Sequence, residues 1–411
     1  MELQRPPLHL FEGFGIELEY MIVDASLCVL PVCDRVLAAA AGETVNEVED
    51  GALCWSNELV MHVIELKTNG PAPMLLDLDG LFLEGVARVN ERLAPFGGRL
   101  LPTAMHPLMD PSRQTRLWPH GNRDIYNAYD RIFRCRGHGW SNLQSMHINL
   151  PFAGDEEFAR LHAAIRLLLP LLPGLCASSP LMEGRATGLL DTRLDVYRRN
   201  QRRIPSIAGQ LVPEAALSHA DYLEKILAPM YRDIAPFDPQ GILQEEWLNS
   251  RGAIARFERN AIEIRVIDIQ ECPAADIAVA TLVVAVLRAL TEGRWGDPAL
   301  HRDWPLAPLV RLFDEAVRDA DRTLVEDGDY LRLFGYPKAK ATLKEFWNHL
   351  AQEAAPQLSA PCGRALSVLL EEGPLSRRIL RALGPEPGRR EILALYRQLG
   401  DRLAEGRVFC P

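Results

Sequence analysis

The chain has 411 residues, of which 48% are hydrophobic and 24% are charged, as is typical of a globular protein with a substantial core. One large domain or two smaller ones are both compatible with this length. The 45 Lys and Arg residues against 55 Asp and Glu residues leave a formal net charge of -10, so we expect no general attraction to nucleic acid or to an anionic membrane.

The first predicted strand, Gly15–Val23, carries two acids on one face. Alternate side chains of a strand point to opposite faces, so Glu17 and Glu19 lie on one side and the apolar residues between them on the other. Two carboxylates on one face repel each other. They indicate either a solvated face or a cleft that contains a cation or an arginine.

A second pair of acids, Glu58 and Glu65, flanks an apolar stretch, and Glu65 lies in the predicted strand Val63–Thr68. If Leu59–Ile64 is helical, the two acids share one side, whereas in a strand they point to opposite sides. Glu65 is the more telling residue because it interrupts an apolar run just before a turn. Glu58 fits an ordinary surface acid equally well. An amphipathic helix, Leu76–Leu93, is predicted to follow.

A histidine lies in the third predicted strand, Met146–Leu150. His147 and Asn149 share one face of this strand, opposite Ile148. A buried histidine is often only a core residue, but a neutral imidazole beside carboxylates can also complete a mostly oxygen coordination sphere. A helix is predicted next, at Glu156–Leu172.

The fourth predicted strand, Ala261–Ile269, places Glu263 and Arg265 on the same face. On an exposed sheet, such a Glu–Arg pair is unremarkable. Its meaning therefore depends on whether this strand lies beside the other acid-bearing strands.

From about Ala274 onward, helical periodicity dominates. We therefore predict an α+β catalytic domain at 1–273 and a mainly helical part at 274–411 packed on it. The most apolar segment, Ala275–Leu290, contains Asp276 and Arg288 and is shorter than the roughly 20 residues of a membrane span, so it predicts a buried helix. The helices predicted in this part are Ala275–Thr291, Pro308–Val325, Ala341–Gln352 and Arg389–Leu403.

The sequence shows no signal peptide at its start. Its eight cysteines form no CxxC pair and no Cys/His cluster with zinc spacing. These features predict reduced thiols and a cytoplasmic protein.

Taken together, the four strands offer an acid-rich set of metal ligands: Glu17, Glu19, Glu65, His147 and Glu263. Carboxylates hold hard cations, which in turn hold triphosphate oxygens. No GxxxxGK[ST] loop is present, and no GxGxxG follows a predicted strand. The pattern thus predicts a site in which two or three magnesium ions, rather than a glycine-rich loop, hold ATP.

Five segments between Phe14 and Pro273 resemble, in order, segments of the type 2 glutamate–cysteine ligases and their carboxylate–amine ligase relatives. They are GIELEY, IELKT, MHINL, ASSPLMEGRATGLLDTR and NAIEIRVID. The fourth carries the family-like residues Ser178, Ser179, Pro180, Gly184, Thr187, Gly188 and Arg193.

The resemblance implies a glutamine-synthetase-like fold, in which a curved, mainly antiparallel sheet forms a funnel with helices outside. It also implies ATP, magnesium and an acyl-phosphate mechanism that joins a small-molecule carboxylate to an amine. Arg265 and Glu65 would be catalytic, and Arg193 and Arg185 would bind a substrate carboxylate. The implied metal ligands are Glu17, Glu19, Glu58, Glu65, His147 and Glu263.

Two departures from the family pattern leave the substrates open. Ser145–Asn149 stands where relatives commonly carry Gly-x-His-x-His, and Leu181–Glu183 lacks an aromatic residue common after Ser-Ser-Pro. Glutamate plus cysteine is therefore one candidate pair. A phosphotransferase on the same sheet and a non-catalytic nucleotide-binding relative are the alternatives, and assembly into a homo-oligomer is left open.

Overall fold

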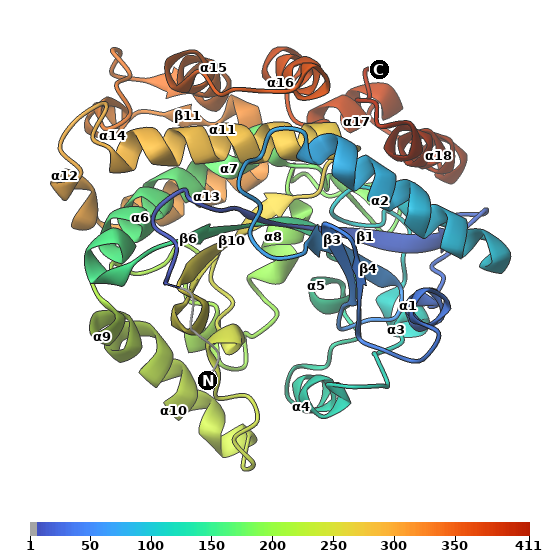
Figure 1. The fold of residues 1–411 in the computed structure, drawn as a ribbon. Coiled ribbons are helices and arrows are strands. Elements are labelled where there is room, and N and C mark those ends of the chain that lie inside the picture. The colour runs from blue at the N-terminus through green and yellow to red at the C-terminus, as the bar shows by residue number, and fades with distance from the viewer. Residues whose placement is uncertain (1–5) are drawn as a thin grey trace.

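The computed structural model describes residues 6–411. It contains an eight-stranded antiparallel sheet with long helices along one face (Figure 1), which confirms the predicted α+β fold. Seven strands are neighbours in the order β2 (Glu47–Asp50), β3 (Leu53–Asn57), β4 (Val63–Thr68), β1 (Gly15–Asp24), β6 (Ser145–Pro151), β10 (Ala261–Asp268) and β9 (Ala253–Arg256), while β5 (Gly98–Leu101) pairs with β1.

The four predicted acid-bearing strands are adjacent in this sheet, as β4, β1, β6 and β10. In β1, the residues that alternate with the acids, from Ile16 to Ile22, are fully buried in the main core. The alternation thus decides which face packs against helices and leaves the acids on the opposite face.

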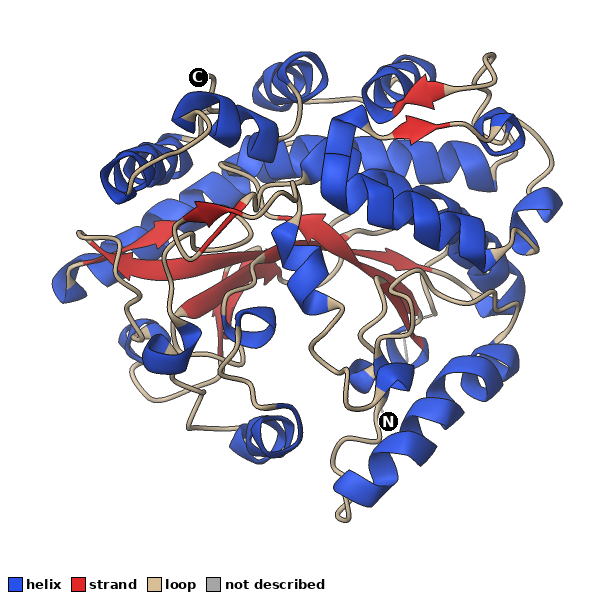
Figure 2. Ribbon diagram, turned by 180° about the vertical axis from the view of Figure 1, so that it is seen from behind, coloured by secondary structure: helices blue, strands red, loops and turns tan. Residues whose placement is uncertain are grey.

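Three long helices cover the apolar face of the sheet: α2 (Leu78–Leu93), α6 (Gly154–Leu168) and α11 (Pro273–Thr291). Helix α11 contacts both of the others, and Figures 1 and 2 show it running along the sheet. By length and composition, Gly154–Cys176 and Pro273–Thr291 resemble membrane spans, but 94% and 83% of their most apolar windows are buried in the fold. Such extensive burial is typical of helices in the core of a globular protein.

Shorter helices lie on the other side of the sheet, where α4, α5, α9 and α10 surround the acid-bearing face (Figure 1). Besides α2 and α6, the α-helices between β1 and the end of β10 are α1 (Cys33–Ala41), α3 (Pro111–Gln114), α4 (Arg123–Phe133), α5 (His138–Ser141), α7 (Leu172–Cys176), α8 (Thr192–Tyr197), α9 (His219–Tyr222) and α10 (Ala228–Ile234). Strands β7 (Leu181–Met182) and β8 (Arg185–Ala186) form a small hairpin.

The C-terminal part forms an outer helical layer in Figure 1. One hydrophobic core contains residues from Phe11 to Leu403 and so extends across position 273; the domain boundary there stays a prediction. The elements of this part are α12 (Ala299–Arg302), α13 (Leu306–Asp319), β11 (Leu324–Val325), α14 (Gly328–Arg332), β12 (Ala341–Thr342), α15 (Leu343–Ala354), α16 (Ala360–Glu372), α17 (Leu375–Leu383) and α18 (Arg389–Glu405).

Two predicted helices differ from the observed ones. The helix predicted at Pro308–Val325 ends at Asp319, because the residues after it turn into β11, which pairs with β12. The helix predicted at Glu156–Leu172 is interrupted at Leu169–Leu171 by a 3-10 turn that contains Pro170, which lacks the N–H of a regular helix.

Candidate active site

The acid-bearing face of the sheet is assembled by the register of four neighbouring strands. Glu19 of β1 lies opposite Glu65 of β4, and Glu17 lies opposite His147 of β6. On the next strand, Glu263 pairs in register with Asn149. Residues separated by more than 200 positions in the sequence therefore meet on one surface.

His147 is the hub of this cluster. Its Nδ1 lies 2.8 Å from Glu17 Oε2 and 3.6 Å from Glu263 Oε1, while its Nε2 lies 3.9 Å from Glu19 Oε1. Ser145, two residues earlier on the same face, donates from its backbone N–H to Glu19 over 2.7 Å. The imidazole is thus within reach of three carboxylates.

Glu65 belongs to β4, which lies on the other side of β1 from the strand that carries His147. Ser56 of β3 donates its hydroxyl to Glu65 over 2.6 Å, and Lys67 Nζ lies 3.2 Å away. Burial and the charge of Glu17 raise the pKa of Glu65 to about 7, because both oppose its ionised form. A nearby cation would relieve this opposition.

The charges of Glu17 and His147 support each other. Burial opposes ionisation of Glu17, but the hydrogen bond and the charge of His147 prevail and lower the pKa of Glu17 to about 2. Burial likewise opposes protonation of His147, but the same carboxylate and the charge of Glu19 raise its pKa to about 9. In the metal-free protein, His147 therefore acts as the counter-ion of the acids.

The donor set fits divalent cations. Two groups of three residues each have ligand atoms that all lie within 4.8 Å of one another. One group is Glu17, His147 and Glu263, and the other is Glu19, Glu65 and His147. Carboxylate oxygens suit magnesium, and a neutral imidazole can join them. Five of the six predicted metal ligands are therefore placed together.

The sixth predicted ligand, Glu58, lies in the connection between β3 and β4, so neither the helical nor the strand alternative describes it. Within residues 6–411, it joins neither group of ligand atoms. It lines the same cavity as Glu19, however. Burial, together with the charges of Glu19 and Glu65, raises the pKa of Glu58 well above its usual value.

Arg265 flanks the metal-ligand cluster because β10 is bulged. The register passes from Ile264 opposite Ile148 to Ile267 opposite Met146, so β10 contains one extra residue there. Arg265 Nε lies 3.0 Å from Glu263 Oε1. The predicted catalytic arginine thus reaches the edge of the acid cluster.

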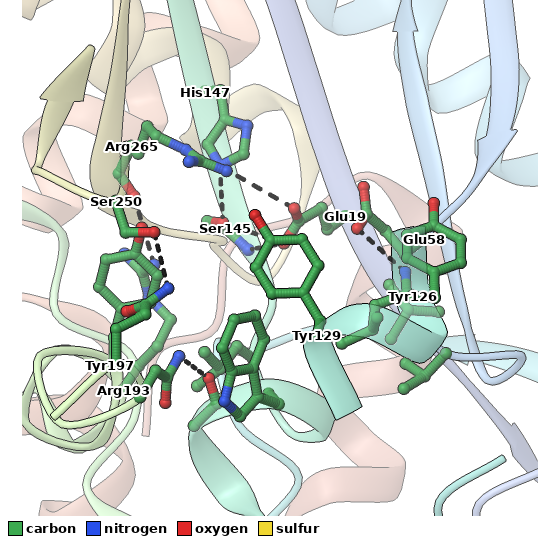
Figure 3. A pocket seen from close by; sticks show the side chains of 18 of the residues that line it. Glu19, Glu58, Tyr126, Tyr129, Ser145, His147, Arg193, Tyr197, Ser250 and Arg265 are labelled. Atoms are coloured by element: carbon green, nitrogen blue, oxygen red, sulfur yellow. Dashed lines mark hydrogen bonds and ion pairs between the residues drawn. The ribbon is translucent and has the colours of Figure 1, made fainter. Parts of the chain in front are cut away.

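A cavity of about 210 Å³ opens beside this cluster (Figure 3). Glu19, His147 and Arg265 line it, and Figure 3 shows the ring of Tyr129 in the same space. Its aromatic wall consists of Tyr126, Tyr129, Trp140, Tyr197 and Trp247. This wall excludes water from one side of a polar site.

Arg193 lines the cavity, but its geometry differs from the predicted two-pronged grip on a substrate. Its Nε pairs with Asp268 Oδ1 at 2.5 Å, and its Nη1 donates to the carbonyl of Arg265 over 3.3 Å. Its Nη2 is buried and has no partner within residues 6–411. The guanidinium is thus held mainly by groups of the protein itself.

Arg185, the second predicted substrate ligand, lies exposed on the β7–β8 hairpin and is absent from the residues that line the cavity. The sequence pattern placed it near Arg193, but the hairpin directs this segment outward. We therefore leave Arg185 out of the proposed site.

A second hollow, of about 440 Å³, lies at the other end of the acid cluster. Its charged lining residues are Glu17, Glu47, Lys67 and Arg259, and Lys67 pairs with Glu47 over 2.7 Å. The acid cluster thus lies between the aromatic cavity and a second hollow of mixed charge.

Several site residues escaped the sequence analysis. Ser145 shares the strand face of His147 and Asn149, and this periodicity could have identified it. Tyr129 and Trp140 come from short helices on the other side of the site, and their sequence offers no signal that they meet the sheet.

The antiparallel sheet, with long helices on one face and a carboxylate–histidine cluster on the other, agrees with the glutamine-synthetase-like fold that the resemblance implies. The family model described as glutamate–cysteine ligase family 2 matches residues 13–397. The chain therefore belongs to this family, as the resemblance predicted, and thus to the carboxylate–amine ligases.

The chain is also similar to individual proteins. An uncharacterised protein of Archaeoglobus fulgidus is 34% identical over 396 residues, which cover 96% of this chain and 99% of the relative. The fold resembles a glutamate–cysteine ligase from Francisella tularensis, with a TM-score of 0.65, 14% identity, and coverage of 96% and 90%. It also resembles a bifunctional glutathione synthetase from Pasteurella multocida, with a TM-score of 0.60, 12% identity, and coverage of 95% and 53%.

Proposed function

We propose that the protein is a cytoplasmic, magnesium-dependent enzyme that uses ATP to join a small-molecule carboxylate to an amine through an acyl phosphate. The observation that carries this proposal is the cluster around His147, which lies between an aromatic cavity and a second hollow. A reaction that links a nucleotide to two other substrates needs separate spaces that meet at one charged centre.

We place the nucleotide in the second hollow and the other substrates in the aromatic cavity. Arg259 lines the second hollow and would attract phosphate oxygens. The Francisella tularensis ligase of similar fold was crystallised with AMP, which supports nucleotide binding by this architecture.

The chemistry divides between phosphoryl transfer and amide formation. An oxygen of the substrate carboxylate attacks the γ-phosphorus of ATP, and ADP leaves. The amine nitrogen then attacks the acyl carbon, phosphate leaves with the electron pair of the broken C–O bond, and the nitrogen loses a proton. Such transfers depend on positioning and charge stabilisation more than on a protein nucleophile.

The chain's residues supply that positioning. Glu17, Glu19, Glu65, His147 and Glu263 would hold magnesium, which neutralises phosphate oxygens when bound. Arg265, at the edge of the acid cluster, would stabilise charge on the transferring phosphoryl group. Arg193, which lines the aromatic cavity, would contact the carboxylate substrate.

The test is a screen of carboxylates and amines in pairs, with ADP release and product mass measured together. We expect ADP release to require magnesium and one member of each class, with a product whose mass equals the two substrates minus water. Glutamate and cysteine are the first pair to test. ADP release with one substrate and a phosphorylated product would establish a phosphotransferase instead, and nucleotide binding without turnover by any pair would favour a non-catalytic relative.

A further inference from the structure

A groove of about 650 Å³ adjoins the aromatic cavity. Gly139, Trp140 and Asn200 line both spaces, so the two share one wall. The outer groove is bounded by the segment after α4 and the segment after α8. It is the natural path for a ligand that is longer than the cavity.

The groove is basic, although the protein as a whole is acidic. Its lining includes four arginines and one acid, Asp195, whereas the whole chain has a net charge of -10. The arginines are Arg134, Arg199, Arg202 and Arg203. Arg199, Arg202 and Arg203 belong to the arginine-rich stretch that follows Arg193. The proposed reaction centre uses none of these three.

Two of the four arginines have roles within the protein. Arg199 forms an ion pair with Asp195. Arg203 packs its guanidinium over the ring of Phe237, 4.4 Å from the centroid, and donates to the carbonyl of Ile132 over 3.1 Å. These two are therefore partly satisfied without a ligand.

Arg134 and Arg202 differ from them. Both are exposed, and neither has a carboxylate within ion-pair distance in the described part of the chain. Arg134 ends α4 in the left-handed conformation, with φ of 59°, and its backbone N–H donates to Asp130. The backbone thus fixes the position from which the unpaired side chain of Arg134 extends.

We propose that this arginine groove binds a distal anionic group, a carboxylate or a phosphate, of a substrate whose reacting end occupies the aromatic cavity. The inference rests on the proposed ligase function for the identity of that reacting end. Guanidinium groups match carboxylates and phosphates through paired N–H donors. The substrate would accordingly be longer and more acidic than a single unmodified amino acid.

The charge of the surroundings supports a role in selection. A local positive groove on a negative protein concentrates anionic ligands at one entrance and repels cationic ones. A ligand that spans both spaces gains from two linked contacts, and a short ligand gains from only one. Selectivity should therefore depend on ligand length as well as on charge.

The test uses calorimetric binding of triglutamate, a tripeptide of O-phosphoserine, triglutamine, free glutamate and inorganic phosphate to the nucleotide-free protein. We expect one of the two acidic tripeptides to bind, and triglutamine to bind at least about tenfold more weakly. The double variant Arg134→Gln/Arg202→Gln should lose about tenfold or more in affinity for that tripeptide. The two acidic peptides distinguish a carboxylate site from a phosphate site.

Arg390→Gln is the matched control. Arg390 lies exposed on α18, outside the groove, and its replacement should leave peptide binding unchanged. Unchanged peptide binding in the double variant, or absence of binding by both acidic tripeptides, would overturn the proposal. Inorganic phosphate bound as tightly as the peptides, with the same loss in the double variant, would also overturn it by showing a free-anion site.

The binding measurement needs no turnover, so it is separate from the test of the ligase function. If no substrate pair releases ADP but the double variant loses tripeptide binding, the ligase proposal fails and the groove remains. If ADP release proceeds with a substrate pair but tripeptide binding is absent or insensitive to the variants, only the groove proposal fails.

Discussion

Glu19 and Glu65 lie directly opposite each other on adjacent antiparallel strands, with 8% and 6% of their surfaces exposed. Like charges in this cross-strand position destabilise a sheet, and burial makes their repulsion stronger. Ser145 and Ser56 each donate a hydrogen bond to one of the two carboxylates, while Lys67 lies 3.2 Å from Glu65 and His147 lies 3.9 Å from Glu19. These two side chains offset part of the repulsion, and a shared metal cation would offset it further.

Glu65→Gln should therefore reduce ATP turnover by about two orders of magnitude or more, while the protein remains folded. The amide preserves the shape and can still accept the hydrogen bond from Ser56, but it loses the charge that holds magnesium. Steady-state ADP release at several magnesium concentrations, with circular dichroism as the check on folding, measures both parts.

Glu49→Gln is the matched control for this variant, because Glu49 is exposed on β2 of the same sheet. It should leave turnover and magnesium dependence unchanged. Near-normal turnover of the Glu65→Gln enzyme at low magnesium would show that Glu65 is not a metal ligand.

Magnesium and a non-hydrolysable ATP analogue should together raise the melting temperature by more than the sum of their separate effects. A ligand that binds only the folded state stabilises it, and here each component is expected to complete the site of the other. Differential scanning fluorimetry measures this. The Glu65→Gln protein should lose the excess shift, and purely additive shifts in the wild type would argue against a metal-bridged nucleotide.

Arg193→Lys should lower kcat/KM for the carboxylate substrate by about one to two orders of magnitude. A lysine retains the charge beside Asp268 but cannot replace both the Nε bond and the free Nη2 of the guanidinium. The KM for ATP should change little, because Arg193 lines the aromatic cavity rather than the second hollow. A variant whose chief defect is weak ATP binding would place this arginine at the wrong end of the site.

Acid should destabilise the fold between about pH 6.5 and pH 4 through buried neutral histidines. His106 accepts a hydrogen bond from the N–H of Leu108 at Nδ1 and donates from Nε2 to the carbonyl of Leu27. Burial lowers the pKa of His106 to about 4, and burial likewise lowers the pKa of His62 to about 4. Within this pH range the unfolded chain binds more protons than the folded one, so the free energy of unfolding falls as pH falls.

Urea titrations from pH 7 to pH 4 measure this dependence. The variant His106→Gln removes one titrating group, and its slope should be smaller by up to about 1.4 kcal/mol per pH unit. His219→Gln, at an exposed histidine, is the control. A pH dependence that is identical in wild type and His106→Gln would show that His106 does not contribute.

The strand face of the site was predictable because alternation is a local property of the sequence. Once Glu17 and Glu19 alternate with buried apolar residues, their shared face follows from strand geometry alone. The same reasoning applies to His147 and Asn149. The family resemblance then implied that these strands share one curved, mainly antiparallel sheet, but it did not give their order in that sheet.

The rest of the site depends on long-range contacts that local patterns do not encode. The bulge that positions Arg265 exists only because β10 pairs with β6. Tyr129 and Trp140 belong to short helices whose approach to the sheet follows from tertiary packing. The ion pair of Arg193 with Asp268 joins residues 75 positions apart, so the sequence could indicate an arginine near the site but not its partner.

The most direct test of the central claim follows an oxygen atom. The carboxylate substrate identified by the paired screen is labelled with ¹⁸O in both carboxylate oxygens and incubated with ATP, magnesium and the amine. An acyl-phosphate mechanism predicts that each inorganic phosphate released carries one ¹⁸O, because the carboxylate oxygen that attacks phosphorus leaves with it. Amide product accompanied by unlabelled phosphate would contradict the account.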